Sequence, residues 1–408
     1  MPGPEHVGET RVPATGRAPV AWYAQPDMTV YLIVLMAFLS QAGFGGSRVA
    51  VSLHALHLSA NQFAIGVVIA LYSLCPMLFA ILIGRMADRV SPRRLVLLGT
   101  LIMTGALLIP VLVPGIPALC VAAFILGLSH QVFSLPIEAL IGGIGGVEKR
   151  ARNYAIITMA WSAANFLGPM MAGFSIDHIG QLEVYIVLAV FTFAPVVMLI
   201  MRPEMLPESA RVKAGAEEKR GSVLDLWRIP ALRNTIIAAG VVGSAQDLFQ
   251  FYMPIYGHSI ELSASAIGTI LGTSSLAAFV IRGILPFLSR RLTEAQILKS
   301  AIFIAAFAFS LFPLFAHPYA LGVIAFVLGL GVGCAMPMTM SLLYAMAPAS
   351  RLAEAFGLHK TVRNATHLVV PIVFGSIGAA FGFVTVFLAN SGLLATAGFL
   401  LRKLKTAR

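Results

Sequence analysis

Long apolar segments alternate with short polar ones along almost the whole chain. A helix that crosses a bilayer needs about 20 apolar residues, and the sequence offers twelve such segments, six on each side of residues 203–230. They are 29–53, 62–84, 94–113, 117–141, 153–175, 182–202, 232–256, 264–288, 296–316, 318–345, 355–379 and 382–402. The pattern predicts an all-α integral membrane protein whose twelve transmembrane helices form two six-helix bundles.

The lysine and arginine residues between these segments all fall on alternate connections. The remaining connections contain neither residue type. Short loops rich in arginine and lysine stay on the cytoplasmic side of a membrane. The charge pattern therefore predicts a multi-pass protein of the cell's inner (plasma) membrane with both termini in the cytoplasm. The basic connections are 85–94, 149–152, 202–233, 290–291 and 351.

Composition excludes several other classes of protein. The chain is 58% hydrophobic and 11% charged, whereas a soluble domain has about 25% charged residues. The net charge of +11 comes from the cytoplasmic loops and does not indicate a nucleic-acid partner. The three cysteines lie in apolar segments, and no metal-ligand spacing, catalytic triad or phosphate-binding loop is found. We therefore expect no enzyme activity, cofactor, metal site or ATP drive.

The polar segments divide the chain into five parts. Residues 1–27 are rich in proline and lack the order of a signal peptide, so we expect a disordered cytoplasmic tail. The two bundles are expected at 28–202 and 231–403, with a second cytoplasmic tail at 404–408. The linker at 203–230 is charged and then amphipathic, which predicts a short helix along the membrane surface.

The two halves repeat each other at an offset of 202 residues. The sequence Ala-Ile-Gly at 64–66 recurs at 266–268, and Pro169 and Gly173 recur as Pro371 and Gly375. A shared offset in several helices indicates a duplication with pseudo-two-fold symmetry. Paired bundles of this kind place a substrate site at their interface and expose it by rocking.

The connection after the second segment resembles a signature of the major facilitator superfamily. Gly84, Asp88 and Arg89 are followed by Arg93 and Arg94, and the resemblance covers the chain from about residue 28. It implies the superfamily's fold, with transport by alternating access. It also implies a gate, since the Asp88 carboxylate can reach the positive N-terminus of a helix in the other bundle. The alternative is that this charged cluster only sets the topology.

The fifth segment is similar to a motif of the drug:proton antiporter branch of that superfamily. Gly168, Pro169 and Gly173 match the motif, while two earlier glycines are replaced by alanine. The resemblance implies a bias toward export, and the alternative is a seam of small residues for helix packing. The branch's buried arginine in the fourth helix is an alanine here, so proton coupling through that residue is not implied.

Ionisable groups inside predicted spans point to function, because burying them in a bilayer costs several kcal/mol. Asp247 is the only carboxylate placed deep in a span, so it is either a proton carrier or the static partner of Arg48. Glu138 and His367 are further candidates for proton coupling. The eleventh helix has a polar face because His359, Arg363 and His367 recur every four residues. The candidates for substrate binding are Arg48, His130, Gln131, Gln246, Gln250, Arg363 and Asn364.

Within the spans basic groups outnumber acidic ones, which favours an anionic or zwitterionic solute. We therefore predict a proton-coupled secondary transporter that exports a small organic compound through the lipid bilayer as a monomer. The alternative is a proton symporter that imports an organic anion. A transporter-like sensor is less favoured, because neither the linker nor the tails look like a folded signalling domain.

Overall fold

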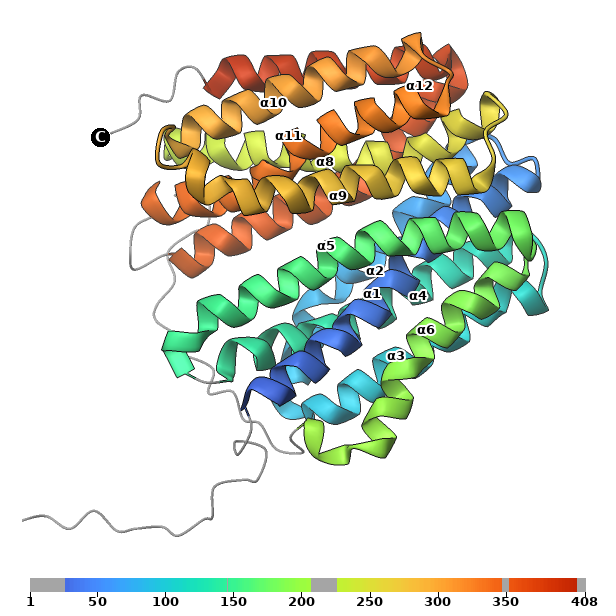
Figure 1. Ribbon diagram of the computed structural model, residues 1–408, viewed down its shortest axis with the longest axis vertical. Coiled ribbons are helices and arrows are strands. Elements are labelled where there is room, and N and C mark those ends of the chain that lie inside the picture. Colours follow the sequence, from blue (N-terminus) through green and yellow to red (C-terminus); the bar gives the residue numbers. More distant parts are fainter. Residues whose placement is uncertain (1–25, 145, 207–225, 347–351, 402–408) are drawn as a thin grey trace, which may run out of the picture.

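The structure is a computed structural model that describes residues 26–144, 146–206, 226–346 and 352–401 (Figure 1). Within these ranges the chain is helical and contains no strand. The all-α prediction is therefore confirmed. The N-terminal tail, most of the linker with its expected surface helix, and the C-terminal tail lie outside the described residues.

Long helices account for nearly all of the described chain, and they lie side by side in Figure 1. The first half holds α1 (Pro26–His57), α2 (Gln62–Arg89), α3 (Pro92–Leu112), α4 (Ile116–Gly143), α5 (Gly146–His178) and α6 (Glu183–Met201), followed by the short helix η2 (Pro203–Met205). The second half holds α8 (Pro230–Ser259), α9 (Ala264–Leu288), α10 (Glu294–Leu311), η3 (Phe312–Leu314), α11 (Pro318–Met346) and α12 (Leu352–Leu401).

The last two expected spans appear as one long element. Helix α12 has 50 residues, but Gly382 interrupts it with φ of 79°. Glycine adopts this left-handed conformation without the steric penalty of a β-carbon, so the chain turns there between two membrane-length arms. Ten helices of the described residues are long and apolar enough to cross a membrane. Helix α8 is not one of these ten, since the polar residues Gln246, Asp247 and Gln250 lie within its otherwise apolar sequence.

The expected loop at 84–94 is much shorter in the structure. Helix α2 continues to Arg89, and α3 already begins at Pro92. Arginine side chains at a helix end can reach the interface while the helix itself continues, so charge alone did not mark the end of α2. Proline is favoured at the first position of a helix and disfavours helical backbone in the residue before it. The Ser91–Pro92 pair therefore separates the two helices.

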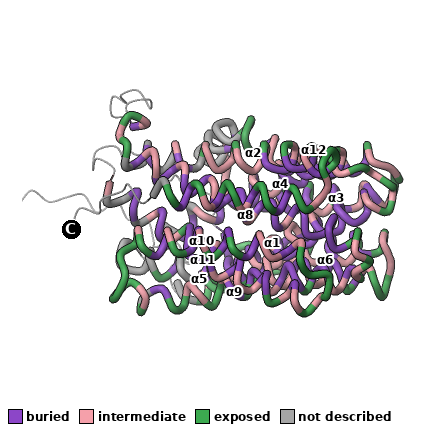
Figure 2. The backbone as a smooth tube through the Cα atoms, turned by 90° about the horizontal axis from the view of Figure 1, so that it is seen from above, coloured by how far each residue is buried: buried purple, intermediate pink, exposed green. Residues whose placement is uncertain are grey.

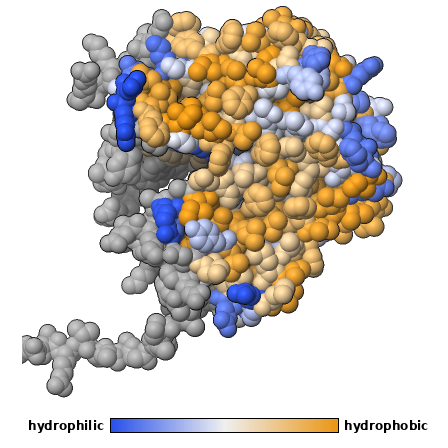
Figure 3. Space-filling view, in the orientation of Figure 1, coloured by the Kyte–Doolittle hydropathy of each residue, from blue (hydrophilic) through white to orange (hydrophobic). Residues whose placement is uncertain are grey.

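Each half packs mainly within itself. In the first half α1 lies against α5 and α6, and α3 lies against α4 and α6. In the second half α11 lies against α9 and α10, and α8 lies against α12. Buried residues run between the helices, while exposed ones follow the outside (Figure 2). The face seen in Figure 3 is largely apolar, with polar residues gathered toward its two ends, as expected for helices that contact lipid.

Two helix pairs make most of the contact between the halves, α5 with α9 and α2 with α12. A β-carbon added at Gly268 of α9 would run into the carbonyl oxygen of Pro169, and one added at Gly66 of α2 would run into that of Pro371. These two contacts are related by the offset of 202 residues. Small residues allow close backbone approach between membrane helices. The sequence repeat therefore corresponds to equivalent contacts across the interface.

The contacts between these two helix pairs extend to the end of the molecule where α2 and α9 begin. A β-carbon at Gly173 would meet the backbone of Ala264, and one at Gly375 would lie 2.9 Å from the carbonyl oxygen of Gln62. Asp177 adds an asymmetric contact, because its carboxylate accepts hydrogen bonds from the backbone nitrogens of Ala264, at 3.1 Å, and Ser265, at 2.7 Å. We call this the closed end; the charge pattern predicts that it faces outward.

Replacing Asp177 with alanine should loosen the closed end. Loss of a helix-capping carboxylate costs about 1 kcal/mol, which corresponds to about fivefold easier opening. The measurement is the labelling rate of an introduced Leu271→Cys by an impermeant maleimide, with the native cysteines replaced. Leu271 is buried and lines the space between the halves.

The control is Glu183→Ala, which removes an exposed carboxylate at the start of α6. This control should leave the labelling rate unchanged. Equal rates in the Asp177 variant and the unmodified chain would show that the contact does not hold the closed end.

Candidate functional site

A cavity of about 660 Å³ lies between the two halves. Its walls come from α1, α4 and α5 on one side and from α8, α9, α11 and α12 on the other. Binding sites for small molecules commonly enclose about 300 to 1,000 Å³. The position and size of the cavity therefore suit the substrate site expected at the interface of the halves.

Most of the predicted substrate and coupling residues line this cavity, together with one residue of the antiporter-like motif. They include the substrate candidates Arg48, His130, Gln246, Gln250 and Arg363, the coupling candidates Glu138, Asp247 and His367, and Pro169 of the antiporter-like motif.

Gln131 and Asn364 are not among the described residues that line the cavity. Each follows a lining residue directly, and consecutive positions on an α-helix point about 100° apart. Their prediction as substrate contacts is not supported by the geometry. His359 is buried and also lies outside the lining, although it shares the helical face of Arg363 and His367.

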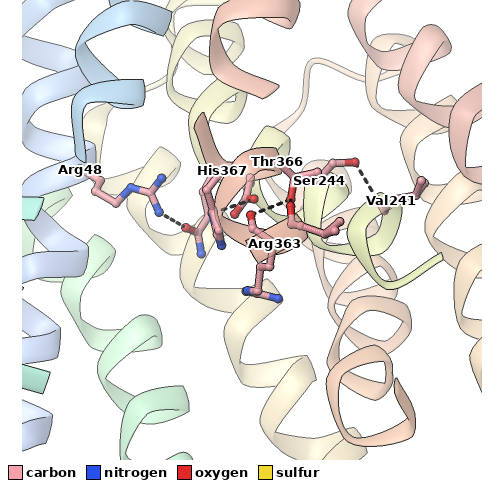
Figure 4. A network of polar contacts seen from close by, with 9 residues as sticks. Arg48, Val241, Ser244, Arg363, Thr366 and His367 are labelled. Atoms are coloured by element: carbon pink, nitrogen blue, oxygen red, sulfur yellow. Dashed lines mark hydrogen bonds and ion pairs between the residues drawn. The ribbon is translucent and has the colours of Figure 1, made fainter. Parts of the chain in front are cut away.

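Asp247 forms an ion pair with a residue that the sequence did not suggest as its partner. Nδ1 of His367 lies 2.8 Å from Oδ2 of Asp247, which joins α12 to α8, and Asp247 is only 2% exposed. Arg48 instead donates a hydrogen bond to Oε1 of Gln250 at 3.1 Å (Figure 4). This bond crosses between the halves at two positions related by the repeat. The expected Arg48–Asp247 pair is thus replaced by two separate pairs.

Two further arginines place positive charge in the cavity. Arg282 donates to Oγ of Ser162 and so links α9 to α5. The guanidinium of Arg363 points away from His367 in Figure 4, and among the described residues no hydrogen-bond partner is recorded for it. Arg363, Arg282 and Asp247 all line this cavity. Two nearby guanidiniums repel each other in a low-dielectric site, and an anion between them would relieve that repulsion.

The first half lines the cavity with a network of neutral side chains, beside its two charged residues Arg48 and Glu138. Nε2 of His130 lies 2.8 Å from Oε1 of Gln41, and the Gln41 amide donates to Oδ1 of Asn165 at 3.0 Å. The His130 ring is also stacked on Phe44, with centroids 3.9 Å apart and an interplanar angle of 16°. His130 is therefore both a packed residue and a lining residue, which combines the two roles that a helix histidine can have.

Sequence reasoning missed Gln41, Trp161 and Asn165 as lining residues. The repeat held a signal for two of them, because positions 161 and 165 correspond to 363 and 367 at the offset of 202. Those two positions had already been singled out in α12. Mapping them onto α5 would have pointed to Trp161 and Asn165.

The antiporter-like motif packs α5 against two neighbours. A β-carbon at Gly168 would run into the carbonyl oxygen of Ala42 in α1, while Pro169 and Gly173 meet α9. Close packing by small residues is therefore observed, and a bias toward export stays a prediction.

The signature around the end of α2 is only partly visible. The side chains of Gly84, Asp88 and Arg89 lie outside the described residues, so the gate at Asp88 stays a prediction. At the start of α3, Arg93 is half-buried and Arg94 is exposed.

Helices of membrane-spanning length packed around a polar cavity are the architecture of a membrane transport protein. The family model of the Major Facilitator Superfamily matches residues 33–371. The chain belongs to this superfamily, which confirms the predicted family and fold. It is a multi-pass membrane protein and a transporter, not an enzyme.

Known relatives agree with this assignment. The multidrug resistance protein MdtG of Klebsiella pneumoniae (strain 342) is 23% identical over 292 residues, which cover 67% of this chain and 71% of the relative. A crystal structure of a mutant nucleoside transporter NupG matches with a TM-score of 0.79 at 15% identity, over 93% of this chain and 100% of the other. A mutant peptide transporter POT matches with a TM-score of 0.77 at 16% identity, over 91% and 93%. At these identities the solved structures show the fold alone.

Proposed function

We propose that this transporter is a proton-coupled exporter of a small zwitterionic compound. It works as a monomer in the inner membrane, with both termini in the cytoplasm. The observation that carries the proposal is the Asp247–His367 pair in the same cavity as Arg363, whose guanidinium is available to a ligand. The MdtG relatives, named as multidrug resistance proteins, and the motif at Gly168, Pro169 and Gly173 support export.

Competition between the protonated His367 and the substrate amine for the Asp247 carboxylate would couple proton movement to transport. Asp247 is held by His367, and a proton on the imidazole strengthens that pair. An ammonium group of a substrate would compete with the protonated imidazole for the same carboxylate. Proton and substrate then occupy the cavity alternately, which is the requirement for antiport.

The acidic end of the substrate would bind a different part of the cavity from the amine. Arg363 offers a planar set of donors that matches a carboxylate, and Arg282 lies near enough for its charge to contribute. A zwitterion therefore satisfies both the cationic and the anionic part of the cavity. The conformational change would separate the contacts of the closed end, including that of Asp177 with α9.

The second candidate function is import of an organic anion with a proton. It is favoured by the same excess of arginines, since Arg48, Arg282 and Arg363 face only Glu138 and Asp247 among the charged residues of the described lining. An anion without an amine would leave the proton on the Asp247–His367 pair. Anion and proton would then move together, which is symport.

Inside-out membrane vesicles distinguish the two functions. Vesicles that contain the protein are acidified internally by respiration, and uptake of labelled trans-4-(aminomethyl)cyclohexanecarboxylate, a small zwitterion, is measured. An exporter driven by antiport should accumulate the compound at least severalfold over vesicles without the protein, and a protonophore should abolish the difference. Proton-dependent uptake of an amine-free carboxylate by intact cells, with no zwitterion uptake by the vesicles, would favour symport.

A further inference from the structure

The two walls of the cavity differ in chemistry at matching positions of the repeat. Trp161 and Asn165 of α5 correspond to Arg363 and His367 of α12, and all four residues line the cavity. One half therefore contributes an indole and an amide where the other contributes a guanidinium and an imidazole paired with Asp247. A symmetric scaffold with such different walls suits a ligand whose two ends differ in the same way.

The first half lines the cavity with aromatic rings as well as with Arg48 and Glu138. Phe44 and His130 form a stacked pair, and Trp161 lines the cavity from the neighbouring helix α5. Hydrogen bonds through Gln41 to Asn165 fix the His130 ring. A ring that is already held in place loses little conformational freedom when a ligand packs on it. This wall is thus preorganised for a flat apolar group.

The charged wall adjoins this aromatic wall. Arg282 reaches from α9 to Ser162, which directly follows Trp161 in the chain. Its guanidinium therefore lies beside the aromatic wall, and its charge and that of Arg363 act on each other. The anionic end of a ligand between these two arginines would leave its ring within reach of the indole.

We propose that the cavity selects planar aromatic zwitterions. The ring packs on Phe44, His130 and Trp161, the carboxylate binds Arg363 and Arg282, and the amine binds Asp247. This proposal rests on the proposed function and names the substrate class of the same site. Aromatic contacts contribute about 0.5 to 1.5 kcal/mol beyond area burial, so we expect an aromatic ligand to bind about two- to tenfold more tightly than a saturated ligand of the same shape.

Equilibrium binding to the purified full chain tests this proposal by titration calorimetry. The probes are 4-(aminomethyl)benzoate and its saturated counterpart trans-4-(aminomethyl)cyclohexanecarboxylate, which carry the same two charges. The unmodified protein should bind the aromatic probe severalfold more tightly. Trp161→Leu should remove this preference, so that the variant binds the two probes equally, and binding of the saturated probe shows that the variant is folded. Phe44→Leu provides a second, independent variant.

Each outcome decides a different claim. Equal affinities for the two probes, or a preference that survives both Trp161→Leu and Phe44→Leu, would overturn the aromatic selection and leave the proposed function standing. Binding of neither probe to the unmodified protein would overturn the zwitterionic substrate itself, and the aromatic proposal with it.

Discussion

Asp247→Asn should abolish proton-driven accumulation of substrate, while exchange of substrate for substrate continues at a raised substrate concentration that offsets the lost contact with the substrate amine. Asparagine keeps the size of the side chain and an oxygen that can accept from Nδ1 of His367, but it removes the negative charge for which, in the proposed mechanism, the imidazole and the substrate amine compete. Accumulation in proteoliposomes with an imposed pH gradient should fall from manyfold to the level of simple equilibration. Exchange, measured without a gradient, reports that the variant is folded and still alternates.

A second carboxylate gives the matched comparison. Glu138 also lines the cavity, from α4, and it was a coupling candidate in the sequence. If the Asp247–His367 pair carries the proton, Glu138→Gln should keep proton-driven accumulation. Loss of coupling in Glu138→Gln together with retained coupling in Asp247→Asn would show that Glu138 of α4 carries the proton.

Arg363→Gln should weaken binding of a carboxylate ligand by about ten- to a hundredfold. A hydrogen bond to a charged group contributes about 1.5 to 3 kcal/mol, and among the described residues the Arg363 guanidinium has no hydrogen-bond partner that would compete for it. The measurement is the dissociation constant of trans-4-(aminomethyl)cyclohexanecarboxylate and of its carboxamide. The loss should be confined to the carboxylate, since the amide carries no charge for Arg363 to bind.

Thermal unfolding provides the control for this variant. Removing Arg363 also removes its repulsion with Arg282, so the melting temperature should stay the same or rise. An equal loss of affinity for the carboxylate and its amide would mean that Arg363 shapes the cavity and does not contact the acid. A large fall in melting temperature would assign it a structural role.

The helices were predictable because hydrophobicity alone decides which segments enter a membrane. The expected span 264–288 coincides with α9, which has Ser263 as its N-terminal cap. The ends of other helices were harder, as at Arg89, because a helix can continue past the hydrocarbon while its charged side chains reach water. Gly382 marks a place where the chain turns between two helices with hardly any loop.

The cavity was predictable in part because ionisable residues within apolar helices are costly to bury. Their pairing was not, since it depends on how helices far apart in the sequence rotate against each other. The sequence places Arg48 and Asp247 at similar depths in the membrane. The packing of α12 on α8 nevertheless makes His367, and not Arg48, the partner of the Asp247 carboxylate. The hydrogen-bond network around Gln41 was not predictable in this way, because Gln41 and Asn165 are not ionisable.

Proton release on substrate binding tests the central claim most directly. The purified protein is placed in a weakly buffered solution with a pH indicator, and trans-4-(aminomethyl)cyclohexanecarboxylate is added to saturation. Competition at Asp247 predicts a release of up to about one proton per chain and no release from Asp247→Asn. Proton uptake, or saturating binding without any release at every pH examined, would contradict proton-coupled export by this cavity.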